Sequence, residues 1–157
     1  MLGGLLILVP LVTYYTVPSV LRRSGFSPLN IRTLPYRDTA LYFFLPDKSS
    51  YFGAARYGRG VLEILPPHSV VLADFITGVV LEYLQTVEGF RPDVTIVRIE
   101  NRPPGKRPLE AVNQYSGQRQ IYLTDYRDHT QYFAVETLSR EYEFVPDGLL
   151  FLLRKKG

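Results

Sequence analysis

The chain has 157 residues, enough for one domain with an attached segment, and a formal net charge of +3. It contains no cysteine, which excludes a disulfide framework and a thiolate metal site, and its two histidines are too few to favour a histidine-based metal centre. The arginine and lysine residues are scattered rather than gathered in a stripe, so we expect no nucleic-acid partner.

The N-terminal residues are uncharged and apolar from Leu2 to Leu21, and Arg22-Arg23 follows them. A run of roughly 20 apolar residues matches the thickness of a bilayer core, and prolines such as Pro10 and Pro18 kink such a helix without forbidding it. The pattern predicts a transmembrane helix over residues 1–23, with the lipid bilayer as a partner. A signal-like segment and a buried helix remain open as alternatives.

The sidedness of the following part has conflicting signals. The arginines at positions 22, 23, 32 and 37 all lie after the apolar segment, and no basic residue precedes it. By the positive-inside rule alone, the globular part would be cytoplasmic.

Residues 24–48 have no clear periodicity and are expected to form a connector. Within it, Ala40 to Leu45 is compatible with a short strand or with an apolar strip at the membrane surface. A helix is expected from Ser49 or Ser50 to about Leu65, although Gly53, Gly58 and Gly60 weaken it, and Pro66-Pro67 ends it.

The central part of the chain has the pattern of a βαβ unit. Val70 to Ala73 is a short apolar run typical of a buried strand, and Val94 to Ile99 is a second β-branched strand. Between them, Thr77 is a candidate N-cap and Gly89 a candidate helix stop. The expected apolar face of this helix consists of Val79, Val80, Tyr83, Leu84 and Val87.

The remaining pattern continues the alternation of strands and helices. A helix is predicted over Leu109 to Tyr115 and a third parallel strand over Gln120 to Thr124. Two further strands, Glu141 to Val145 and Leu149 to Leu153, flank Pro146-Asp147-Gly148, which we expect to form a hairpin turn with proline at its first central position. The predicted fold of residues 49–157 is a small Rossmann-like three-layer α/β domain with a parallel sheet and a C-terminal β-hairpin.

Ligands of open parallel sheets bind beyond the carboxyl ends of the strands. A helix N-terminus at this edge also favours anions. The candidate ligand-binding residues at this edge are Asp74, Thr77, Gly78, Asn101, Asp125 and Tyr126. The alternative is that Asp74 and Asp125 cap backbone N–H groups in tight turns, which is a common use of aspartate.

Other sequence motifs give weaker evidence for a catalytic or binding site. Gly58-Arg59-Gly60 lacks the strand–turn–helix context of a dinucleotide fingerprint, and no nucleophile elbow or P-loop is present, so no cofactor is expected. His68 and His129 are each isolated and have no evident orienting partner. Arg91-Pro92-Asp93 is expected to pin a turn, with Asp93 accepting backbone N–H groups and Arg91 pairing with Glu88.

A set of short motifs resembles one known family. The most specific is the run Tyr-Leu-Gln-x-Val-Glu-Gly-x-Arg-Pro-Asp-Val at residues 83–94, and further fragments lie at residues 36–38, 45–48, 53–57, 65–67, 71–74 and 145–148. In this order they resemble the C-terminal part of bacterial multipass membrane proteins of domain-of-unknown-function family 2723. Those proteins are relatives of protein O-mannosyltransferase-like proteins in the GT-C glycosyltransferase class.

The resemblance implies a last membrane helix followed by an extracytoplasmic domain, because earlier helices of a multipass parent fix its topology. Catalysis in that class uses acidic loops between N-terminal membrane helices and a lipid-phosphate-linked sugar, so no residue of this chain inherits a catalytic role. We expect an accessory module that packs against membrane-embedded helices of the same or an adjacent protein, or positions an acceptor or donor. The alternatives are a small hydrolase or transferase acting at the sheet edge, and a plain protein-interaction module.

Overall fold

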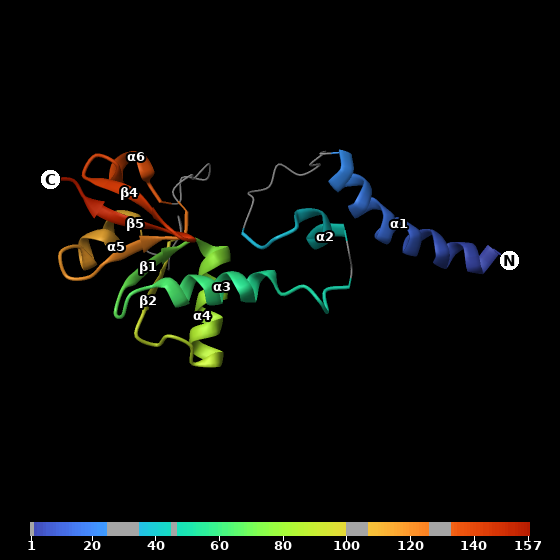
Figure 1. The fold of residues 1–157 in the computed structure, drawn as a ribbon, viewed down its shortest axis with the longest axis horizontal. Coiled ribbons are helices and arrows are strands. Elements are labelled where there is room, and N and C mark those ends of the chain that lie inside the picture. The colour runs from blue at the N-terminus through green and yellow to red at the C-terminus, as the bar shows by residue number, and fades with distance from the viewer. Residues whose placement is uncertain (1, 25–34, 45–46, 100–106, 126–132) are drawn as a thin grey trace. The chain divides into compact units, whose positions relative to one another are not determined.

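The computed structural model describes residues 2–24, 35–44, 47–99, 107–125 and 133–157 (Figure 1). The chain divides into two compact units, Met1–Ala54 and Ala55–Gly157. The α/β domain predicted over residues 49–157 lies in the second unit except for residues 49–54, which belong to the first.

The first unit contains two helices, α1 (Leu2–Ser24) and α2 (Thr39–Phe44). In α1 the structure describes the side chains of residues 8–24, except that of residue 22. Within the described residues, no helix is both long enough and apolar enough to cross a bilayer. Of the predicted membrane-spanning segment over residues 1–23, residues 2–23 are helical, but a transmembrane helix is not supported.

For residues 40–45 the sequence was compatible with a short strand or with an apolar strip at the membrane surface. The described part of this segment, residues 40–44, is helical instead. In α2 the backbone N–H of Tyr42 donates to the carbonyl of Asp38 at 2.8 Å, which closes a helical turn. A short run of apolar residues has no unique period, so the sequence pattern does not separate a strand from a helix here.

The second unit is built on a five-stranded sheet. Strands β1, β2 and β3 are parallel, as predicted, and β5 joins β3 in the antiparallel direction, so that the C-terminal hairpin extends the same sheet. The order across the sheet is β2-β1-β3-β5-β4. The strands are β1 (Val70–Ala73), β2 (Thr95–Arg98), β3 (Ile121–Leu123), β4 (Tyr142–Asp147) and β5 (Leu150–Lys155).

Helices cover both faces of this sheet (Figure 1). On one face, α3 (Gly53–Ile64) and α4 (Phe75–Glu88) pack over Val71 and Ala73. On the other face, α5 (Pro108–Tyr115) and α6 (Val135–Leu138) pack over Val70 and Leu72. Because successive side chains of a strand point to opposite faces, the uninterrupted apolar run of β1 supplies both cores. The predicted three-layer α/β arrangement of the globular part is confirmed.

Helix α4 begins three residues earlier than the sequence pattern indicated. Its N-cap is Asp74, not Thr77, since the Asp74 carboxylate accepts from the backbone N–H groups of Ile76 and Thr77. The helix ends at Gly89, as predicted, where a φ of 64° places the residue in the left-handed region that glycine adopts without strain.

The packed face of α4 also differs from the prediction. The buried residues are Thr77, Gly78, Leu81 and Leu84, whereas Val79, Tyr83 and Val87 are exposed. Since α4 is apolar on two sides, its hydrophobic periodicity does not specify which side faces the core.

The hairpin turn was also predicted two positions too early, since its first central residue is Gly148 and not Pro146. Pro146 lies inside β4, opposite Phe151, and the turn falls at Gly148-Leu149 with Gly148 at φ 60°. Strand β4 is at the edge of the sheet, and an edge strand tolerates proline because one side of it needs no hydrogen-bonding partner.

Candidate functional site

The predicted ligand site lies at the carboxyl edge of β1 and β3. The structure brings Asp74, Thr77 and Gly78 together at the start of α4, and it places Asp125 at the end of the adjacent strand β3. Asn101 and Tyr126 lie outside the described residues. The neighbouring strand ends follow from the parallel pairing of β1 with β3.

The carboxylate of Asp74 is engaged by its own helix. Its Oδ1 accepts from the backbone N–H of Ile76 at 2.9 Å and of Thr77 at 3.1 Å, while Oδ2 accepts from the Thr77 hydroxyl at 3.0 Å. The residue is 2% exposed. The carboxylate of Asp74 therefore holds the start of helix α4.

A second hydroxyl belongs to this cluster. The oxygens of the Thr77 and Thr124 side chains lie 3.2 Å apart, and both residues are buried. Together with Asp74 they form a chain of polar groups that links α4 to the end of β3. Sequence reasoning missed Thr124, although its position as the last residue of the predicted third strand was a signal for it.

The amides at the start of α4 are satisfied within the helix. The backbone N–H of Gly78 donates to the carbonyl of Asp74 at 2.7 Å, and those of Ile76 and Thr77 donate to the Asp74 side chain. Among the described residues, no group of three His, Asp or Glu side chains gathers as a metal ion requires. The edge therefore has the geometry of a structural cap.

The motif at Arg91-Pro92-Asp93 forms a second polar cluster, at the opposite edge of the sheet. Nη1 of Arg91 donates to the carbonyls of Leu62 at 2.6 Å and Leu65 at 2.9 Å, at the end of α3. The same guanidinium pairs with Asp93, which also accepts from the backbone N–H of His68 at 3.2 Å. The pKa of Asp93 is held well below its ordinary range by the hydrogen bond from Arg91.

Gln85 completes this cluster from α4. Its amide nitrogen donates to the carbonyls of Arg91 and Val94, both at 2.8 Å. The predicted pairing of Arg91 with Glu88 is wrong, because Glu88 pairs with Arg59 of α3. The prediction that this motif pins a turn is confirmed, and its residues also bind the end of α3 to the loop before β2.

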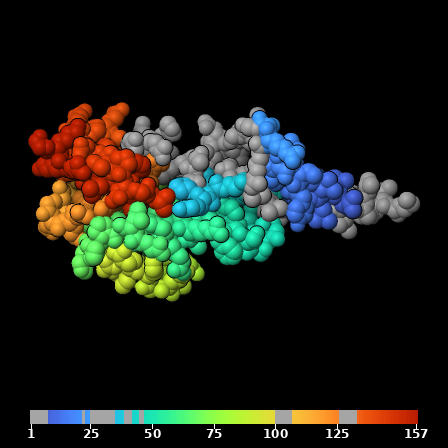
Figure 2. Space-filling model, in the orientation of Figure 1, coloured from blue at the N-terminus to red at the C-terminus, as the bar shows by residue number. Residues whose placement is uncertain are grey.

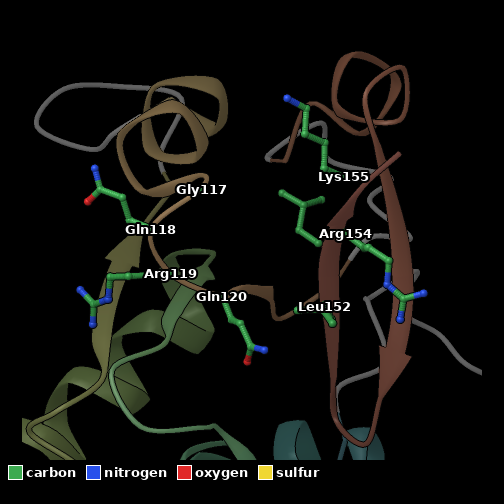
Figure 3. A pocket seen from close by; sticks show the side chains of 8 residues that line it. Gly117, Gln118, Arg119, Gln120, Leu152, Arg154 and Lys155 are labelled. Carbon is green, nitrogen blue, oxygen red and sulfur yellow. The ribbon is translucent and has the colours of Figure 1, made fainter. Parts of the chain in front are cut away.

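An open hollow of about 420 Å³ lies between the loop before β3 and the end of β5. Its lining includes the basic residues Arg119, Arg154 and Lys155. Figure 3 shows that the side chains of Arg119 and Arg154 point in opposite directions, away from the space between them. Arg119 bonds to Thr95 and to backbone carbonyls, and Arg154 pairs with Glu143. These two cations therefore do not converge on a ligand.

The outer side of α4 carries an apolar surface, which we call the α4 face. It consists of Phe75, Ile76, Val79, Tyr83 and Val87, with exposures between 42% and 64%. Figure 2 shows the α4 segment, in yellow-green, at the surface of the molecule. A contiguous exposed apolar surface on a globular domain indicates an interaction site.

A scan against protein-family models and searches of curated proteins and of solved structures find no match to this chain.

Proposed function

We propose that this chain is a non-catalytic accessory module of a GT-C-like membrane glycosyltransferase of the protein O-mannosyltransferase-like type. The observation that carries the proposal is the enclosed Asp74 carboxylate, whose two oxygens accept hydrogen bonds from the start of its own helix. A general acid or base must come within hydrogen-bonding reach of its substrate. At 2% exposure, Asp74 is better suited to holding the fold than to catalysis.

The geometry of the family-like run at residues 83–94 supports the same view. Its polar residues Gln85, Arg91 and Asp93 bond to one another and to backbone carbonyls of the second unit. Gly89 supplies the left-handed helix end within the run. Residues that maintain a scaffold fit a module that assists chemistry performed elsewhere.

In this proposal the α/β domain is extracytoplasmic, and the apolar N-terminal helix associates with the bilayer or with membrane helices of the same or an adjacent protein. The catalytic acidic loop and the lipid-phosphate-linked sugar belong to that membrane part. The domain helps to pack against it or to position an acceptor or donor.

The test is a sugar-transfer assay with the full chain in phospholipid vesicles. A polyprenyl-phosphate-linked mannose serves as donor, with a serine- and threonine-rich peptide as acceptor. We expect no transfer by the chain alone. Transfer by the chain alone that is lost in an Asp74→Asn, Asp125→Asn double variant would overturn the proposal and establish the alternative of an enzyme at the sheet edge.

A further inference from the structure

Helix α1 exposes apolar side chains on all of its sides. Each of residues 8–16 is exposed, and seven of these nine residues are Leu, Val, Pro or Tyr. A helix that is apolar all round is normally covered, either by the core of a large protein or by lipid. The surface of α1 therefore fits an apolar medium better than it fits water.

The threonine hydroxyls of this stretch are satisfied within the helix. The hydroxyl of Thr13 donates to the carbonyl of Val9 at 2.8 Å, and that of Thr16 donates to the carbonyl of Val12 at 2.7 Å. A hydroxyl that is bonded in this way needs no water and can enter a medium without hydrogen-bonding partners. These two bonds favour hydrocarbon as the surroundings of α1.

The net charge of the chain is confined to the same unit. Residues 1–54 carry five basic and two acidic side chains, whereas residues 55–157 carry equal numbers of both, so the net charge of +3 belongs to the first unit. All five basic residues follow the exposed apolar stretch at residues 8–16. An apolar helix combined with net positive charge complements a bilayer that contains anionic lipid.

Two of these cations gather on one aromatic ring, in a group that we call the Tyr42 cluster and that consists of Arg37, Tyr42, Phe43 and Lys48. Cζ of Arg37 lies 5.6 Å from the centroid of the Tyr42 ring, and Nζ of Lys48 lies 5.2 Å from it. Lys48 also donates to the carbonyl of Tyr42. Phe43 meets the Tyr42 ring edge-on, with 5.0 Å between the ring centroids.

The Tyr42 cluster is open to the outside and belongs to an element that touches α1. Tyr42 and Phe43 are 42% and 45% exposed, and α2, which carries both, contacts α1. Tyrosine rings together with Lys and Arg are typical of the headgroup level of a bilayer, where the ring is half-immersed and the cation meets phosphate. The cluster therefore supplies the polar part of a surface whose apolar part is α1.

We propose that the first unit docks on a bilayer that contains anionic phospholipid, with residues 8–16 of α1 among the acyl chains and the Tyr42 cluster at the headgroup phosphates. This inference rests on the membrane association in the proposed function and names the class of lipid. The two fail separately: a chain with no preference for anionic lipid loses this inference alone, while sugar transfer by the chain alone overturns only the accessory role.

The experiment is flotation of the full chain with vesicles of phosphatidylcholine alone and of phosphatidylcholine mixed with phosphatidylglycerol. We expect binding to both, tighter binding to the anionic vesicles, and a preference that shrinks as salt is added. One basic residue near an anionic surface strengthens binding about fivefold, so the pair Arg37→Gln, Lys48→Gln should weaken binding to anionic vesicles by roughly tenfold or more. Binding of this variant to phosphatidylcholine alone should be unchanged.

Two further variants separate the position of the charges from their number. Arg140→Gln, Lys155→Gln removes two exposed cations from the second unit and should leave the preference for anionic vesicles unchanged. Arg37→Lys, Lys48→Arg keeps both charges and should retain the preference. Circular dichroism checks that each variant is folded.

A variant of α1 tests the apolar part of the surface. Val12, which is 52% exposed, becomes charged in Val12→Asp, and this variant should bind both kinds of vesicle more weakly. Any of four outcomes would overturn the proposal: equal binding of the wild type to the two kinds of vesicle, an equal loss from the glutamine pairs in the two units, full binding by Val12→Asp, or calorimetric binding of inorganic phosphate alone that the glutamine pair at positions 37 and 48 abolishes. The last outcome would assign the cluster to a soluble anion.

Discussion

The guanidinium of Arg91 donates two parallel hydrogen bonds to the carboxylate of Asp93, from Nε to Oδ1 at 2.8 Å and from Nη2 to Oδ2 at 2.9 Å. Arg91 adopts a φ of 52°, in the left-handed region that residues other than glycine rarely enter. Bidentate pairs are among the strong hydrogen bonds of proteins, and this one fixes the turn between α4 and β2.

Replacement of Arg91 by alanine should lower the free energy of unfolding by about 2–3 kcal/mol, because the carbonyls of Leu62 and Leu65 lose a charged donor. Arg91→Lys should cost less, since one ammonium replaces part of the planar fork. Urea unfolding measures both. The control is Arg59→Ala, which removes an exposed ion pair and should cost less than about 1 kcal/mol. Equal effects of the alanine variants at positions 59 and 91 would contradict this account.

The stability of the domain should fall at acid pH through Asp93. Its folded pKa lies far below the ordinary value of 3.8, so the unfolded chain binds a proton at this carboxyl at higher pH than the folded chain does. The stabilisation is therefore present above the unfolded pKa and is lost as the pH falls below about 4 toward the folded pKa. Asp93→Asn should show a shallower decline than the wild type in unfolding midpoints measured from pH 7 to pH 2.5. Parallel curves would rule out this contribution.

The stability of the domain should depend on the hydrogen-bond-accepting oxygens of Asp74 more than on the negative charge of this residue. Asp74→Ala should destabilise the domain by about 2 kcal/mol, because two helix N–H groups and the buried Thr77 hydroxyl lose their acceptor. Asparagine is also a good N-cap, so Asp74→Asn should retain more than half of that stability. Thermal unfolding of the three proteins would show the ranking, and an alanine variant as stable as the wild type would refute the role of the cap.

Two glycines in the same helix should respond differently to alanine. A Cβ atom at Gly58 would lie 2.5 Å from Cδ1 of Leu84 and 2.9 Å from Cγ1 of Val80, so α3 and α4 would be forced apart. Overpacking costs about 1–3 kcal/mol and exceeds the gain in helix propensity of about 1 kcal/mol, so Gly58→Ala should destabilise.

At Gly60 a Cβ atom would approach the end of the Leu149 side chain at 3.1 Å, which a small shift relieves. Gly60→Ala should therefore be neutral or stabilising by up to about 1 kcal/mol. Chemical denaturation compares both variants with the wild type. Equal stabilisation by the two alanines would show that helix propensity, and not the contact with α4, governs this helix.

Much of the second unit is predictable from its apolar runs. The strand at Val70–Ala73 is bounded by turn residues and lies at the centre of the parallel pairing, and the helix that follows it ends at the predicted glycine. These features are local, because length, β-branching and a left-handed stop are visible within a short window of sequence.

Some contacts in and near the candidate site are not local, such as the approach of the Thr77 and Thr124 hydroxyls. Glu88 forms an ion pair with Arg59, 29 positions earlier in the chain, whereas Arg91 pairs with its near neighbour Asp93. The exposed side of α4 was also not predictable, since it carries large hydrophobic residues such as Val79 and Tyr83, as the buried side carries Leu81 and Leu84. Periodicity identifies an apolar helix, and only packing decides which of two apolar sides is covered.

The position of β5 has a consequence for how the domain can form during synthesis. This strand follows the other four in the chain, yet it lies inside the sheet, between β3 and β4. Until Leu150–Lys155 has been made, β3 has a bare edge and both cores lack a residue, Leu150 in one and Leu153 in the other. An unfinished chain therefore exposes the unpaired edge of β3 to other chains. A stop codon before residue 150 would leave an incomplete, aggregation-prone sheet rather than a smaller domain.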